Sequence, residues 1–163
     1  MDRPTERRTS RPRRFDSPEQ EAYLHLWRTY DRLRALEDEL FARHGLTAQQ
    51  YNALRLLRGV HPGRLPTLAL AGRLVSRAPD ITRLLDRLAR RGLVERVRPP
   101  DNRRVVEVGI SAAGLALLAG LDAEVRACNA RMLGHLDRAD LRTLNDLLRK
   151  ARRPHEPSDS DWL

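Results

Sequence analysis

Several residue types on which other protein classes depend are scarce in this 163-residue chain. A single cysteine excludes a disulfide within the chain, and the five histidines show neither i,i+4 pairing nor a nearby cysteine cluster, so no zinc motif of known spacing is visible. No hydrophobic run approaches the length of a membrane span. A phosphate-binding loop and a Gly-rich dinucleotide fingerprint are both missing. We therefore expect a protein that is not an enzyme and needs no metal or cofactor.

Charge, by contrast, is abundant. Charged residues make up 33% of the chain and the net charge is +9, which favours a polyanionic partner such as nucleic acid. A membrane surface would also attract this charge, but only 4% of the residues are aromatic and no helical pattern pairs a basic face with an exposed aromatic face. The arginine-rich N-terminus lacks an apolar signal core, and a single cysteine is typical of a reducing compartment. We expect a cytoplasmic protein without membrane association.

Residues 67–92 predict two short helices joined by a tight turn. The first begins at Thr67, whose hydroxyl is expected to cap the helix, and it carries one apolar face. The second follows Ser76, a candidate N-cap, has Pro79 in its first turn and ends at Gly92. Its apolar stripe has the i, i+3, i+4, i+7 spacing of a strongly amphipathic helix and consists of Ile81, Leu84, Leu85 and Leu88.

The polar face of the second helix carries groups that can contact DNA. An arginine can fork onto the O6 and N7 acceptors of guanine, and a hydroxyl can reach a base or a phosphate. Most charged helix faces are merely solvated, but this one lies on the second helix of a pair, which helix-turn-helix proteins insert into the major groove. The candidate DNA contacts on this helix are Ser76, Arg77, Asp80, Thr82, Arg83 and Arg87.

A β-hairpin with an arginine-rich tip is predicted directly after this helix. Residues 93–97 and 105–110 are rich in β-branched side chains, and turn-forming residues fill the segment between them. Arginines at such a tip suit the minor groove, where negative potential is concentrated, although a basic surface hairpin without a ligand is the alternative. The candidate DNA contacts of this wing are Arg98, Asn102, Arg103 and Arg104.

Further helices are predicted on both sides of this unit. Capping boxes at residues 17–20 and 47–50 open two helices before it, and Leu65 is expected to begin a short strand that joins the hairpin. After the hairpin, Ser111 caps a helix, and an aspartate at 137 or 140 opens the last one. The first and last helices carry apolar faces that a small winged domain cannot cover. A two-fold dimer would bury them and would place two recognition helices about 34 Å apart, one turn of DNA.

The expected fold is mainly α-helical with a small β-wing. It combines a winged helix-turn-helix domain with terminal helices that form a dimerisation region. The expected parts are a disordered basic arm at residues 1–16, a helical dimerisation region at 17–45 and 112–153, a winged helix-turn-helix domain at 46–111 and a loose tail at 154–163.

An ordered set of residues runs through the helix pair and the wing. It consists of Leu70, Ala71, Leu74, Ser76, Ile81, Thr82, Arg83, Leu84, Asp86, Arg87, Leu88, Gly92, Leu93, Val94 and Arg96, then Asp101, Asn102, Arg103, Arg104, Ile110, Ser111 and Gly114. This set resembles the MarR family of winged helix-turn-helix transcription regulators, and the resemblance extends from about residue 18 to residue 152. It implies a homodimer joined through the terminal helices, a palindromic operator, usually repression, and often a small phenolic or lipophilic effector that releases the DNA.

The wing departs from the family pattern by one residue. That pattern has an Asp, one further residue and an Arg, placed five residues before a Leu-Thr pair. Counting back from residues 110–111 puts Arg104 at the Arg position, whereas counting forward from Asp101 puts Arg103 there. Both arginines therefore remain candidates for the minor groove.

An effector pocket is a further expectation, located where the first helix meets the winged domain. Trp27, Tyr30 and Tyr51 are candidates to line it, with Arg34 as the partner of an anionic ligand, and ordinary packing of the aromatic rings is the alternative. Cys128 lies in the helix after the wing, and we interpret it as a small apolar filler rather than an oxidant sensor.

Together these patterns and the family resemblance predict a sequence-specific DNA-binding transcription regulator, and the resemblance implies that it is a repressor. It would bind double-stranded DNA at a palindromic operator as a homodimer, and a small aromatic or lipophilic effector would release it. One alternative is an architectural protein that binds DNA without sequence preference, which the +9 charge also favours. Another is an interaction module whose wing and basic face contact an acidic protein.

Overall fold

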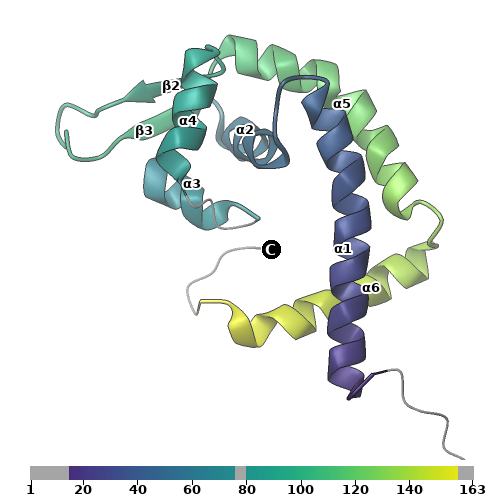
Figure 1. Cartoon of the computed structure of the whole chain (residues 1–163). Helices are drawn as coiled ribbons and strands as arrows, with labels where there is room; N and C mark the ends of the chain where they lie inside the picture. The colour runs from purple at the N-terminus through teal and green to yellow at the C-terminus, as the bar shows by residue number, and fades with distance from the viewer. Residues whose placement is uncertain (1–14, 76–79, 158–163) are drawn as a thin grey trace, which may run out of the picture. The chain divides into compact units, whose positions relative to one another are not determined.

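The computed structural model describes residues 15–75 and 80–157 of the chain (Figure 1). Residues 76–79, which include Ser76, Arg77 and Pro79, lie outside the described residues, as do the segments 1–14 and 158–163 and with them most of the predicted basic arm. The elements are α1 (Pro18–Ala42), α2 (Ala48–Val60), β1 (Leu65–Pro66), α3 (Thr67–Arg73), α4 (Ile81–Arg90), β2 (Val94–Val97), β3 (Glu107–Ile110), α5 (Ala112–Leu133), α6 (Arg138–Arg152) and the 3-10 turn η1 (Arg153–His155).

The chain divides into two compact units, residues 1–35 and 36–163, and the boundary falls within α1. In the first unit the helix leaves several large apolar and aromatic side chains exposed, among them Tyr23, Leu26, Trp27 and Tyr30. The second unit holds the remaining helices and the sheet, and, among the described residues, all the fully buried side chains.

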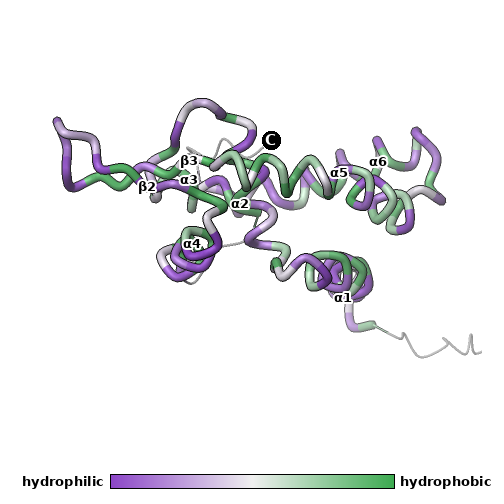
Figure 2. The backbone as a smooth tube through the Cα atoms, turned by 90° about the horizontal axis from the view of Figure 1, so that it is seen from above, coloured by the Kyte–Doolittle hydropathy of each residue, from purple (hydrophilic) through white to green (hydrophobic). Residues whose placement is uncertain are grey.

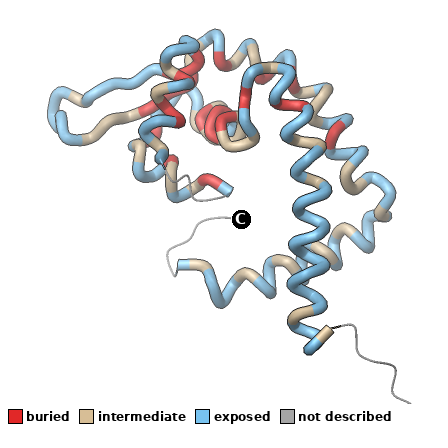
Figure 3. Tube along the Cα trace, viewed as in Figure 1, coloured by how far each residue is buried: buried red, intermediate tan, exposed pale blue. Residues whose placement is uncertain are grey.

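The core of the second unit gathers around α2, where the buried residues of this unit cluster (Figure 3). Ala53, Leu54 and Leu57 of α2 are completely buried because three other helices and the strand β3 pack around them. The stripe predicted for the recognition helix is confirmed, since Leu84, Leu85 and Leu88 of α4 are buried while the polar side of that helix is exposed.

The three strands form one antiparallel sheet in the order β1-β3-β2. Leu65 pairs with Val108, so the short strand predicted at Leu65 does join the hairpin, as expected. Val94 pairs with Ile110, and β2 and β3 extend from there as the wing beside α4 (Figure 1). The fold is thus mainly helical with a small three-stranded wing, as predicted.

Three predicted helix starts are confirmed by their hydrogen bonds. The Thr47 hydroxyl accepts the Gln50 N–H and the Gln50 side chain accepts the Thr47 N–H, which completes a reciprocal capping box. The Ser111 hydroxyl accepts the Gly114 N–H at the start of α5. Of the two aspartates considered for α6, Asp137 is the cap.

Two predicted caps are wrong. Thr67 does not cap α3, because its hydroxyl and its N–H both donate to the Val106 carbonyl and thereby extend the pairing of β1 with β3. The N-cap of α4 is Asp80 rather than Ser76, because the Asp80 carboxylate accepts the Arg83 N–H at 2.9 Å and the helix begins at Ile81.

Gly92 ends α4 in a left-handed conformation, with φ at 68°. The Gly92 N–H donates to the Ala89 carbonyl and the Leu93 N–H donates to the Leu88 carbonyl, the two bonds of a Schellman motif. Leu88 and Leu93 are both buried, which adds the apolar contact that usually accompanies this motif. The turn directs the chain from the recognition helix into the wing.

Replacing Gly92 with alanine should destabilise the fold by about 1–2 kcal/mol, because an L-residue resists the left-handed conformation. A Cβ at Gly92 meets no atom within 4 Å, so the effect is conformational rather than steric. Urea unfolding at a fixed protein concentration measures it. Gly120→Ala is the matched control, since Gly120 lies within α5 and also has an open Cβ position; it should stabilise by about 0.5–1 kcal/mol. Equal stability of the two variants would contradict this account.

Candidate nucleic-acid interface

The helix α4 presents its polar side away from the core. Asp80, Thr82, Arg83 and Arg87 are all exposed, whereas the leucines one turn away are buried. At the start of the helix the Asp80 carboxylate uses both of its oxygens on Arg83. One accepts the Arg83 backbone N–H at 2.9 Å and the other lies 2.9 Å from the Arg83 Nε. The Arg83 side chain remains 81% exposed, so its terminal amino groups face solvent.

A second arginine connects the wing to α4 by hydrogen bonds. Arg96, on β2, donates through Nη1 to the Asp86 carboxylate at 2.7 Å and through Nη2 to the Thr82 carbonyl at 3.2 Å. A guanidinium that binds two points on a helix fixes both the distance and the angle between the two elements. The strand β2 and the recognition helix therefore form one surface rather than two independently moving parts.

The wing tip is built from two successive turns. The Asn102 N–H donates to the Pro99 carbonyl, and the Val105 N–H donates to the Asn102 carbonyl. Arg98 closes the tip, because its Nη1 donates to the Arg103 carbonyl at 3.0 Å. Figure 2 shows this tip as strongly hydrophilic next to the apolar strands. Of the candidate wing residues, Arg98 thus has a structural bond within the hairpin.

A groove of about 390 Å³ separates the wing from the two helices of the pair. Its lining includes the apolar side chains of Leu68 and Leu85 and the cationic side chains of Arg96, Arg98 and Arg104. Arg104 therefore lines the same groove as Leu85 of α4. Arg103 is exposed at the same tip but does not line this groove.

Comparison with known proteins identifies the architecture. Residues 46–106 match the model of the MarR family. The crystal structure of a MarR transcription factor from Planctomyces limnophilus shows 58% sequence identity, covers 83% of this chain and 98% of that chain, and superposes with a TM-score of 0.67. This chain belongs to the MarR family of winged helix-turn-helix transcription regulators. Because these are transcription regulators, membership agrees with the expectation that the protein is not an enzyme.

Two further proteins of lower sequence identity are also similar to this chain. The transcriptional repressor YetL of Bacillus subtilis (strain 168) is 30% identical over 104 residues, which are 64% of this chain and 62% of that repressor. The match therefore spans less than two thirds of the repressor. A solved structure on the regulation of DNA binding of Bordetella bronchiseptica BpsR by 6-hydroxynicotinic acid is 24% identical. It covers 80% of this chain and 98% of that chain with a TM-score of 0.72, which shows the shared fold.

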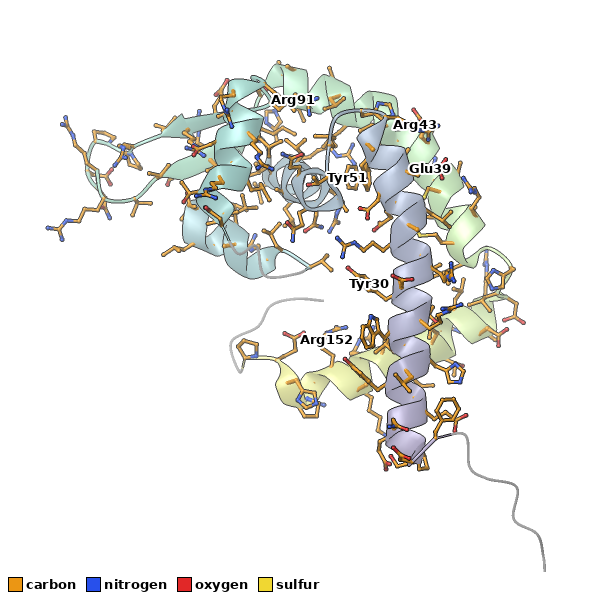
Figure 4. All side chains as sticks on the ribbon, in the orientation of Figure 1. Tyr30, Glu39, Arg43, Tyr51, Arg91 and Arg152 are labelled. Carbon is orange, nitrogen blue, oxygen red and sulfur yellow. The ribbon has the colours of Figure 1, made fainter. Side chains whose placement is uncertain are left out.

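One set of hydrogen bonds that holds α4 in place was not predicted from the sequence. Arg91, at the end of α4 (Figure 4), donates through Nη1 to the Gly45 carbonyl at 2.6 Å and through Nη2 to the His44 carbonyl at 3.1 Å. The same turn meets α5, because Arg43 Nη2 lies 3.2 Å from Glu124 Oε2. These bonds tie the end of the recognition helix to the turn before α2. These bonds could not be predicted from the sequence, because their acceptors are backbone carbonyls 46 and 47 residues away, and a backbone carbonyl is present at every residue.

The residues of the expected effector pocket belong to different units. Trp27, Tyr30 and Arg34 lie in the first unit and Tyr51 in the second, so the pocket remains a prediction. Within its own unit, Tyr51 is half-buried and stacks on Phe41 with ring centroids 4.4 Å apart. Burial raises the pKa of the Tyr51 hydroxyl above its ordinary value.

The described residues include no group of three or more His, Cys, Asp or Glu side chains that could hold a metal ion. Among the same residues, none of the helices combines the length and the apolar character needed to cross a membrane.

Cys128 lies buried in α5 with 7% of its surface exposed. Burial raises the pKa of its thiol, and the nearby Glu37 carboxylate raises it further. The thiolate is the reactive form of cysteine, so both effects lower its reactivity. Burial and the raised pKa favour the interpretation of Cys128 as an apolar filler, which stays a prediction.

We expect the Cys128 thiol to react with an aromatic disulfide reagent far more slowly in the native protein than in the protein unfolded with guanidinium chloride at the same pH. Absorbance of the released thiolate measures both rates, and the unfolded protein supplies the control with one reactive thiol per chain. Equally fast modification of the folded protein would show that Cys128 is accessible and would reopen an oxidant-sensing role.

Proposed function

We propose that this MarR-family regulator is a sequence-specific repressor that binds a palindromic operator as a homodimer in the cytoplasm. The observation that carries the proposal is the bracing of α4 by Arg96, which holds an exposed polar helix face and an arginine-bearing wing on one surface. The similarity to the repressor YetL and to BpsR, whose DNA binding is regulated, supports it.

In this proposal α4 enters the major groove. Arg83 is the principal base-reading residue, because its exposed guanidinium can fork onto guanine O6 and N7. Thr82 and Arg87, on the same exposed side, would contact phosphates or neighbouring bases. Ser76 and Arg77, which lie outside the described residues, complete the proposed set.

The wing would follow the DNA into the adjacent minor groove. Arg103 and Arg104 are the two candidates to enter it, with Asn102 beside them. Arg98 would act mainly by holding the tip, since its guanidinium binds the Arg103 carbonyl. A narrow minor groove concentrates negative potential and attracts such side chains without reading individual bases.

The homodimer is proposed from the uncovered apolar faces. α6 has no buried residue, and its Leu147 exposes 59% of its surface. In the other unit, α1 exposes Leu26, Trp27 and Tyr30. We assign residues 17–45 and 112–153 to dimerisation and residues 46–111 to DNA binding. A second copy would remove these faces from water and present two recognition helices to a palindrome.

The proposal also includes a small-molecule effector that releases the DNA. The relative BpsR responds to 6-hydroxynicotinic acid, a small aromatic anion. We propose that a small aromatic or lipophilic ligand acts on this chain as well, with Trp27, Tyr30, Arg34 and Tyr51 as the first residues to vary. Titrating such compounds into the protein–DNA complex and following release of the duplex tests this.

An architectural protein without sequence preference is the competing function, because the +9 charge would attract any duplex. Selection of bound duplexes from a random pool separates the two. A specific regulator should enrich a palindrome and bind it about 10³-fold or more tightly than random duplex at near-physiological salt. Recovery of an unbiased pool would support the architectural function instead.

On the selected duplex, Arg83→Ala should weaken binding by about 1–3 kcal/mol and relax the preference at one base pair in each half-site. Fluorescence anisotropy with a set of single-base variants of the duplex measures both effects. Arg55→Ala is the matched control, because Arg55 is an exposed arginine on α2 that is neither in the dimerisation region nor among the proposed DNA contacts. If Arg83→Ala retains native affinity and base preference, Arg83 does not read a base.

The dimer makes a separate prediction. Leu147→Glu should shift the protein toward monomer, because it places a charge within the apolar face proposed to be buried. Leu68→Glu is the control, since Leu68 is 83% exposed on α3 and lies outside the dimerisation region, so this variant should stay dimeric. Sedimentation equilibrium gives the molar mass of each. A native protein that sediments as a monomer, or a dimeric Leu147→Glu variant, would contradict the assignment.

A further inference from the structure

The arrangement of Asp80 and Arg83 goes beyond what a helix cap requires. Capping needs a single oxygen that accepts one backbone N–H, and serine or asparagine would serve equally well. Asp80 supplies that oxygen to the Arg83 N–H and places its second oxygen 2.9 Å from the Arg83 Nε. The same carboxylate therefore sets both the start of the helix and the position of an exposed guanidinium on it.

This contact constrains how Arg83 can meet DNA. A guanidinium has five N–H donors, and the single donor on Nε faces Asp80. The two terminal amino groups then remain for a partner with two acceptors, which is what the major-groove edge of guanine offers. Because the carboxylate already restrains the long side chain, Arg83 loses less conformational freedom when it binds.

The charge of Asp80 has a second consequence. A carboxylate on the surface that approaches DNA faces a polyanion, and it offsets the attraction that Arg83 would otherwise have for any phosphate. The other carboxylate on this side of α4, that of Asp86, binds Arg96 of the wing strand instead. Among the described residues of this helix face, Asp80 is thus the acidic residue whose carboxylate pairs with a candidate base-reading arginine, Arg83.

We propose that Asp80 is a positioning residue that sets DNA specificity through Arg83, directing the guanidinium toward guanine and suppressing its attraction to phosphates at other sequences. This inference rests on the proposed function. In this role the acidic side chain of Asp80 lowers the affinity of a basic surface for random DNA. Specificity then arises partly from this lower affinity.

The test uses the full chain and two probes, the duplex selected by the native protein and a random duplex of equal length. Asp80→Asn keeps a good capping side chain but removes the charge and turns an amide donor toward the Arg83 Nε. We expect the ratio of selected to random affinity to fall about tenfold. We also expect the logarithmic salt dependence of random-duplex binding to steepen by about one unit.

Glu156→Gln is the matched control, because the Glu156 carboxylate also pairs with an arginine Nε, that of Arg152 at 2.7 Å, and Glu156 lies outside both the dimerisation region and the DNA-binding domain. It should leave both quantities at their native values. In an Arg83→Ala background, Asp80→Asn should lose most of its effect on the affinity ratio, since Asp80 acts through Arg83. A merely structural cap predicts instead a lower melting temperature and reduced affinity for both duplexes alike.

Several results would overturn the proposal. One is an Asp80→Asn variant with the native affinity ratio and salt dependence, and another is an undiminished effect of that substitution when Arg83 is absent. If Asp80→Asn fails to fold, Asp80→Ser keeps the cap and takes its place, and failure of both variants to fold would make Asp80 structural. A native protein without any sequence preference would refute the proposed function as well, whereas a specific native protein with unchanged variants would refute only this inference.

Discussion

Burial of the leucine stripe on α4 sets the rotation of that helix, and the surface proposed to bind DNA depends on this rotation. Leu84, Leu85 and Leu88 are each buried against the core, and a fully buried leucine stabilises a fold by about 1.5–3 kcal/mol. The exposed ion pairs on the opposite side contribute up to about 1 kcal/mol each. The leucines therefore decide which residues face outward, and the polar contacts adjust how those residues are held.

Polar contacts at both ends and along the side of α4 then define its surroundings. Asp80 caps the start, Arg91 joins the end to the turn before α2, and Arg96 attaches the wing strand to the middle. The first contact pairs a backbone N–H that has no partner within the helix. The second uses two carbonyls of the turn before α2, and the third uses a carboxylate and a carbonyl of α4. A basic protein that read DNA by charge alone would not need acids at these positions. Their presence is consistent with recognition that depends on geometry as well as on charge.

The sequence predicted the elements that depend on local patterns. The spacing of the α4 leucines, the reciprocal capping box at Thr47 and the strand at Leu65 follow from periodicity and short-range hydrogen bonding, and all are present. The start of α4 was predicted at the wrong residue, because Ser76 and Asp80 are both good capping residues and only the fold selects between them. Thr67 was misassigned because its partner, the Val106 carbonyl, lies 39 residues away.

The candidate site was predictable in its exposed residues but not in its contacts. Thr82, Arg83 and Arg87 could be placed on the outer face from helical spacing alone. The partners of Arg91 and Arg96 could not, because a guanidinium that binds distant carbonyls leaves no pattern in the sequence.

Base-resolved interference mapping on the selected duplex tests the central claim most directly, that α4 reads the major groove while the wing follows the minor groove in a two-fold complex. Methylation of guanine N7 probes the major groove, and methylation of adenine N3 probes the minor groove. We expect two regions of N7 interference separated by about 10 base pairs, flanked by N3 interference that weakens when Arg103 or Arg104 is replaced with alanine. Interference that shows no two-fold repeat, or that is absent from the major groove, would contradict it.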